Sequence, residues 1–90
     1  MRVYIGKFRY YYDGGVEVVV ATSQERVEQE LARLMTDYIE PLKQELGHPI
    51  PTSYRDLHHL GLNHEWFSVD WSIEKVHSDG HILKYVMEEI

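Results

Sequence analysis

The sequence predicts an α+β fold in which one long helix packs on one face of a four-stranded antiparallel sheet. Three stretches carry this prediction: a β-hairpin over residues 3–21, an amphipathic helix over residues 22–46 and an alternating strand over residues 66–76. The expected order of elements is β-β-α-α-β-β, and residues 1–90 are expected to form a single domain. Each apolar face needs the other for its burial, which favours two packed layers.

The hairpin is the first predicted element. Residues 3–12 and 16–21 are rich in β-branched and aromatic side chains, and a glycine-rich turn lies at residues 13–15. A three-residue loop would place Tyr10 opposite Val18, with the larger apolar side chains under the helix. We favour this register because a one-residue slip would move every side chain to the other face. The opposite face, here called the open face, is then expected to carry Val3, Ile5, Arg9, Tyr11 and Val19.

The long helix is predicted over residues 22–46. Thr22 and Glu25 form a capping-box pattern at its start, and Gly47 is a natural residue to follow its end. Pro41 removes a backbone donor, so the helix is expected to kink or break near Ile39 and to continue for a last turn or two to Leu46. Apolar residues recur at steps of three and four and form one stripe: Val27, Leu31, Leu34, Met35, Tyr38, Leu42 and Leu46.

A short helix and a strand are expected after the proline-rich connector. Thr52 or Ser53 can cap a helix that runs to about Leu60 and is stopped by Gly61. The strand over residues 66–76 alternates between a polar face, on which Trp66 also falls, and an apolar one. The apolar face carries Phe67, Val69, Trp71 and Ile73.

The last segment, residues 81–90, fits two structures. A turn at residues 78–80 directly after a strand favours a second hairpin and hence a fourth strand. The spacing of Ile82, Val86 and Ile90 fits a C-terminal helix, which would leave a sheet of three strands.

Composition narrows the class of function. The net charge of −6 disfavours binding to nucleic-acid phosphates and favours a basic partner. The chain has no cysteine, which excludes disulfide scaffolds, thiolate metal sites and cysteine nucleophiles, and fits a cytoplasmic location. No apolar run approaches the length of a membrane span.

Patterns for catalysis and metal binding are weak. No serine lies in a Gly-x-Ser-x-Gly elbow, so we expect neither an enzyme nor a cofactor. Six histidines in 90 residues raise the question of a metal site, with His58, His59 and His64 as its candidate ligands. His58 and His59 are adjacent, however, and would point about 100° apart on a helix. We therefore interpret the histidines as exposed polar residues.

A protein-binding role is the leading hypothesis. An apolar and aromatic patch on an open sheet face is typical of an interface, and acidic helix residues could approach a basic groove. The candidate binding residues are Val3, Ile5, Arg9, Tyr11, Val19, Trp66, Glu28 and Asp37.

Two forms of this hypothesis are kept. The chain could form a homodimer through the open sheet face. It could also be an inhibitor or adaptor of a larger protein, by analogy with phage or mobile-element accessory proteins that block host nucleases with carboxylates in place of DNA phosphates. The alternatives are a histidine-rich metal-binding protein and a single-stranded nucleic-acid binder that uses the basic-aromatic hairpin, with Arg2, Lys7, Arg9 and Tyr11.

Overall fold

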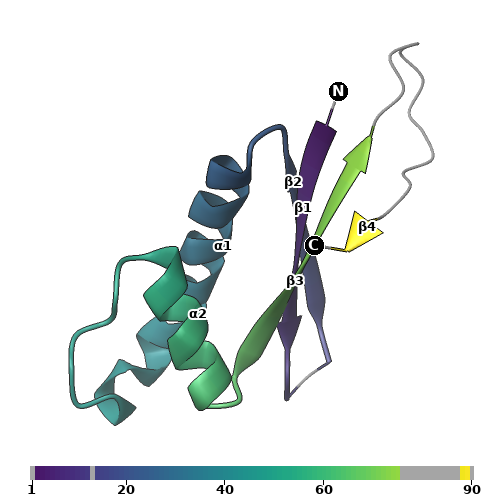
Figure 1. Ribbon diagram of the computed structural model, residues 1–90. Coiled ribbons are helices and arrows are strands. Elements are labelled where there is room, and N and C mark those ends of the chain that lie inside the picture. Colours follow the sequence, from purple (N-terminus) through teal and green to yellow (C-terminus); the bar gives the residue numbers. More distant parts are fainter. Residues whose placement is uncertain (1, 13, 76–87, 90) are drawn as a thin grey trace.

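Two α-helices cover one face of an antiparallel sheet in a computed structural model that describes residues 2–12, 14–75 and 88–89 (Figure 1). The sheet order is β2-β1-β3-β4, so β1 is a central strand and β2 lies at an edge. The strands are β1 (Arg2–Tyr10), β2 (Val16–Ala21), β3 (Phe67–Lys75) and β4 (Glu88–Glu89), and the helices are α1 (Gln24–Ile39), the 3₁₀ helix η1 (Glu40–Glu45) and α2 (Tyr54–Asn63).

The α+β class and the antiparallel sheet of β1, β2 and β3 are confirmed. The choice between a strand and a helix for residues 81–90 lies outside the described residues, apart from β4. Those two residues pair with Ser72 and Ile73 of β3. A complete fourth strand therefore remains a prediction.

The predicted register of the first hairpin is wrong. Val18 pairs with Lys7, not with Tyr10, and Tyr10 donates its N–H to the Gly15 carbonyl across a longer loop (N···O 2.9 Å). The observed pairing of β2 with β1 is shifted from the predicted pairing by an odd number of residues. The side chains of β2 are therefore exchanged between the two faces of the sheet. Val16, Val18 and Val20 lie on the open face, and Glu17, Val19 and Ala21 lie on the helix face.

The close approach of α1 to β1 explains this arrangement. Gly6 is buried under the helix, and a Cβ atom there would lie 2.7 Å from Leu31 Cδ1 and 3.0 Å from Val27 Cγ1. Val19 pairs with Gly6, and Ala21 lies two residues further along β2. The helix therefore packs closely over Gly6 of β1 and over Val19 and Ala21 of β2, and a rule that places the most apolar volume inward fails for β2.

The long helical segment is two helices joined end to end. Ser23, not Thr22, caps α1, because its hydroxyl accepts the Arg26 N–H (N···O 3.3 Å). α1 ends at Ile39, and η1 follows with Pro41 in its first turn, so one kinked helix is not confirmed in that form. The buried residues of α1 are spaced four apart: Val27, Leu31, Met35 and Ile39.

The end of α2 was predicted incorrectly. Ser53 caps the helix as expected, but α2 continues past Gly61 to Asn63. Glu65 then adopts a left-handed backbone (φ 58°), the Glu65 N–H bonds the Leu62 carbonyl, and the Trp66 N–H bonds the Gly61 carbonyl. This hydrogen-bond pair is a Schellman motif with glutamate at the usual glycine position.

The core lies between the helices and the sheet and is partly aromatic. The rings of Phe8 and Phe67 are 4.9 Å apart, and Tyr38 of α1 contacts Phe67 edge-on at 5.6 Å. Phe67, Val69, Trp71 and Ile73 share the helix face of β3, as the alternation predicted. Among the described residues no helix is long and apolar enough to cross a lipid bilayer.

Candidate protein-binding strand

The edge strand β2 exposes the largest row of apolar side chains on the described sheet. Val16, Val18 and Val20 point to the open face and are 50%, 55% and 49% exposed. We call these three residues the valine strip. Single exposed apolar residues are ordinary on protein surfaces, but three consecutive open-face positions on one edge strand form a contiguous patch.

The backbone of β2 is oriented to accept another strand. Hydrogen-bonded and non-hydrogen-bonded pairs alternate along an antiparallel ladder. Tyr10 donates to Gly15, so the hydrogen-bonded pairs of the β1–β2 ladder continue at Glu17 and Val19. The N–H and C=O groups of the valine strip therefore point away from β1, towards the outer edge of the sheet.

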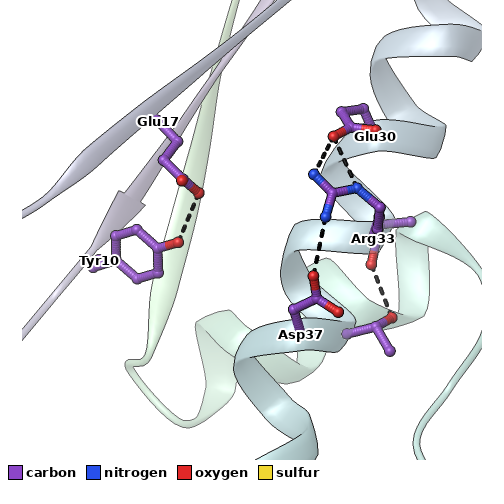
Figure 2. Close-up of polar contacts among 7 residues, drawn as sticks. Tyr10, Glu17, Glu30, Arg33 and Asp37 are labelled. Carbon is purple, nitrogen blue, oxygen red and sulfur yellow. Dashed lines mark hydrogen bonds and ion pairs between the residues drawn. The ribbon is translucent and has the colours of Figure 1, made fainter.

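The usual protection of an edge strand is weak in β2. Natural edges carry lysine, proline or bulges that prevent pairing with another chain, and Val16–Ala21 contains neither lysine nor proline. Its one charged residue is Glu17, on the helix face. The Tyr10 hydroxyl donates to Glu17 Oε2 at 2.8 Å, so the carboxylate is held towards β1 and away from the outer edge (Figure 2).

Val3 and Ile5 lie on the open face as predicted but are only 7% and 5% exposed. The prediction that they form an exposed patch is therefore wrong. Arg9, on the same face, forms an ion pair with Asp70 of β3 (Nε···Oδ2 2.7 Å). This contact neutralises part of the basic character that favoured nucleic-acid binding.

Val19 and Trp66 do not belong to the open face. Val19 lies on the helix face and packs against the core. Trp66 is 7% exposed and precedes β3, so the alternation of the strand does not extend to it. Its ring stacks on His64 at 4.3 Å and lies 6.3 Å from Tyr38.

Tyr11 lies in the β1–β2 loop and is 49% exposed. Its N–H donates to the Trp66 carbonyl at 3.1 Å. With Tyr12, Leu62 and Glu65 it lines a shallow depression at the end of the molecule where the hairpin meets α2. Tyr11 therefore belongs to the loop end of the hairpin, and the structure does not bring the predicted binding residues together at one place.

Part of the predicted acidic surface is engaged in ion pairs. Arg33 Nη1 bonds Asp37 at 3.0 Å, and its Nε and Nη2 atoms bond Glu30 (Figure 2). The hydrogen bonds that Arg33 donates to Glu30 lower the pKa of Glu30 and raise the pKa of Arg33. Glu28 is half-buried on α1. Asp37 thus does not present a free carboxylate.

The three candidate metal ligands have different surroundings. His58 stacks on Tyr54, His64 stacks on Trp66 and His59 is exposed. Burial lowers the pKa of His58, and its buried Nε2 atom has no hydrogen-bond partner in the described part of the chain. Within the described residues, no group of three histidine or carboxylate side chains could hold a metal ion.

Two buried polar side chains on β3 were not anticipated. Ser72 and Glu74 are each 2% exposed, and Ser72 Oγ and Glu74 Oε2 have no hydrogen-bond partner among the described residues. Burial raises the pKa of Glu74, and nearby Lys7 partly opposes this change. The alternation of the strand predicted that both residues share its polar face, but it did not predict that they are buried.

Comparison of the chain with protein-family models, curated proteins and solved structures finds no significant match. Sequence reasoning missed the valine strip because the predicted register turned these valines inward. Gly6 within a strand was the available signal, since an interior glycine often marks a close backbone approach.

Proposed function

We propose that this protein is a non-enzymatic protein-binding domain whose binding site is the outer edge and valine strip of β2. The observation that carries the proposal is the coincidence of three half-exposed valines with outward-pointing backbone groups on the same residues. In β-strand addition, main-chain hydrogen bonds supply affinity and alternate side chains supply specificity. β2 offers both, so the partner binds in an extended conformation.

This site supports an inhibitor or adaptor that docks on a strand of another protein. It gives less support to mimicry of DNA phosphates, because Glu30, Asp37 and Glu40 are held by Arg33 and Lys43. The same reasoning disfavours the nucleic-acid alternative, since Arg9 is paired with Asp70. The absence of cysteine fits action in the cytoplasm.

The test compares immobilised wild-type protein with Val18→Lys, using an extract of the source cells and mass spectrometry of the captured proteins. Val18 is more than half exposed, so lysine leaves the fold intact while placing a charge on the strip. We expect the substitution to abolish capture of the specific partner. Gln29→Lys, at an exposed position of α1, adds the same charge elsewhere and serves as the control. Equal capture by wild type and Val18→Lys would exclude β2 as the binding site.

A further inference from the structure

We propose that the strand bound by β2 is the β2 strand of a second copy, so that two chains share one continuous antiparallel sheet. This inference rests on the proposed function and names its partner. The site requires a partner strand with an open edge, apolar side chains on one face and no charge at the contact. β2 itself has these properties, with an outer edge that no described strand pairs with, a valine strip and a single carboxylate directed towards β1.

The orientation of the pair follows from the ladder. Two copies joined edge to edge by antiparallel strands are related by a twofold axis perpendicular to the sheet, so both helix layers lie on the same side. The outward backbone groups belong to Val16, Val18 and Val20, and these residues must form the hydrogen-bonded pairs of the new ladder. Across the axis, an even-numbered residue of one copy therefore faces an even-numbered residue of the other, and an odd-numbered residue faces an odd-numbered one.

One register uses all three valines. With Val18 opposite the Val18 of the second copy, Val16 faces Val20 and Glu17 faces Val19. With the axis at Glu17, the two Glu17 side chains would be directly opposite, which is unfavourable for like charges. With the axis at Val19, Val16 would face Thr22, which lies outside β2. We therefore place the axis at Val18, where two facing rows of three valines form one continuous patch on the open face.

The charges beside the contact between the two β2 strands predict how the stability of the dimer depends on salt. On the helix face, Arg33 of α1 donates hydrogen bonds to Glu30 and Asp37; Glu30 is the main cause of the raised pKa of Arg33, and the Glu17 carboxylate of β2 adds to it (Figure 2). Three acidic groups against one basic group leave each rim negative, and each chain carries a net charge of −6. Salt screens this repulsion, so higher ionic strength should strengthen the dimer.

The decisive experiment uses a single cysteine in a chain that has none. In a hydrogen-bonded antiparallel pair the Cα atoms are about 5.5 Å apart, within the range that a disulfide spans. Val18→Cys should form a disulfide-linked dimer under mild oxidation, in high yield and reversibly by reductant. Arg55→Cys, at an exposed position of α2, reports random collisions and should remain monomeric under the same conditions.

Sedimentation of the cysteine-free protein provides the second measurement. Wild-type chain should show a dimer whose fraction rises with added salt, and Val18→Lys should be a monomer with an unchanged circular dichroism spectrum. A dimer that survives Val18→Lys, or whose Val18→Cys variant does not cross-link, would mean that another face associates and would overturn the inference.

The remaining outcomes separate the inference from the proposed function. A monomeric wild-type protein that loses a captured partner on Val18→Lys would overturn self-pairing and leave the proposed function standing. A monomeric wild-type protein whose capture does not change on Val18→Lys would overturn both.

Discussion

At the scale of the residue, Glu65 adopts a backbone conformation that L-amino acids disfavour. It occupies the left-handed position of the motif that ends α2, with φ 58°. The left-handed region costs a residue with a Cβ atom roughly 1–2 kcal/mol, and glycine avoids that cost. The sequence therefore retains a locally unfavourable side chain at the junction between α2 and β3.

Replacing this residue tests the cost directly. Glu65→Gly should stabilise the protein by about 1 kcal/mol, which corresponds to about 4–8 °C in melting temperature for a domain of this size. Glu65→Ala keeps the backbone cost and removes only the carboxylate, so it should produce little change. An equal gain in both variants would assign the cost to the carboxylate and not to the backbone.

His58 should make stability depend on pH. Burial, together with the adjacent His59, lowers the pKa of His58 in the folded protein below its ordinary value of 6.5. The unfolded chain therefore binds a proton more readily, and stability present above about pH 6.5 is lost as the pH falls through the folded pKa. Thermal melts from about pH 7 to about pH 5 should show a smaller loss for His58→Gln than for wild type. His59→Gln, at an exposed position, should follow the wild-type slope more closely.

At the scale of the element, Gly61 joins α2 to β3 through a close contact. A Cβ atom on Gly61 would lie 2.1 Å from Phe67 Cε1, so any larger residue would displace the ring from the core. This contact explains why glycine occurs inside α2, where it does not end the helix. It also aligns the start of β3 against the helix layer.

The substitution Gly61→Ala separates packing from helix propensity. In an exposed helix interior the change would gain about 1 kcal/mol. Here overpacking of about 1–3 kcal/mol should dominate, and the urea midpoint should fall. Asn63→Ala, at an exposed position of the same helix, should be neutral or slightly stabilising. A stabilised Gly61→Ala variant would show that Phe67 moves aside at little cost.

Local periodicity accounts for the elements that the sequence predicted well. The alternation in β3 placed Phe67, Val69, Trp71 and Ile73 on the helix face, and the spacing in α1 located its buried stripe. Both patterns depend only on residues close in the chain. The register of the first hairpin depends on distant groups, namely the contact of Gly6 with Leu31 and the hydrogen bond from Tyr11 to Trp66. No local pattern contains that information.

The sequence does not reveal the candidate site because the predicted register of the hairpin is wrong. Once Tyr10 was paired with Val18, the valines were assigned to the core and Val19 to the surface, the reverse of the observed arrangement. Glycine gave a second misleading signal, because Gly61 resembled a helix terminator and serves as a packing position. In both cases a rule based on one residue type failed where a tertiary contact determined the position.

At the scale of the whole molecule, a polar link joins the helix layer to the sheet. Trp71 of β3 donates its indole N–H to the Tyr54 hydroxyl of α2 at 2.9 Å, and the two rings meet edge-on at 6.1 Å. Both side chains are half-buried, and burial raises the pKa of Tyr54. The contact couples the orientation of α2 to that of the central part of the sheet.

The strength of this link can be measured by truncation. Tyr54→Phe leaves the indole N–H without this acceptor and should cost about 1–3 kcal/mol. In a double-mutant cycle with Trp71→Phe, the two losses should be less than additive because they remove the same contact. Tyr12→Phe, at a ring that is 78% exposed, should not change the denaturation midpoint. Strict additivity of the Tyr54 and Trp71 changes would show that the bond contributes nothing to stability.

The central position of β1 has a consequence for the order of folding. β1 pairs on one side with β2, which follows it closely in the chain, and on the other side with β3, so that Tyr10 meets Phe67 and Arg2 meets Lys75. Non-local strand pairing is slow because a long loop must close before any contact is gained. During synthesis the hairpin and α1 can assemble first, while the inner edge of β1 waits unpaired until residues 67–75 leave the ribosome. In that interval the nascent chain has open strand edges on both sides of its hairpin, and the late docking of β3 closes the inner one.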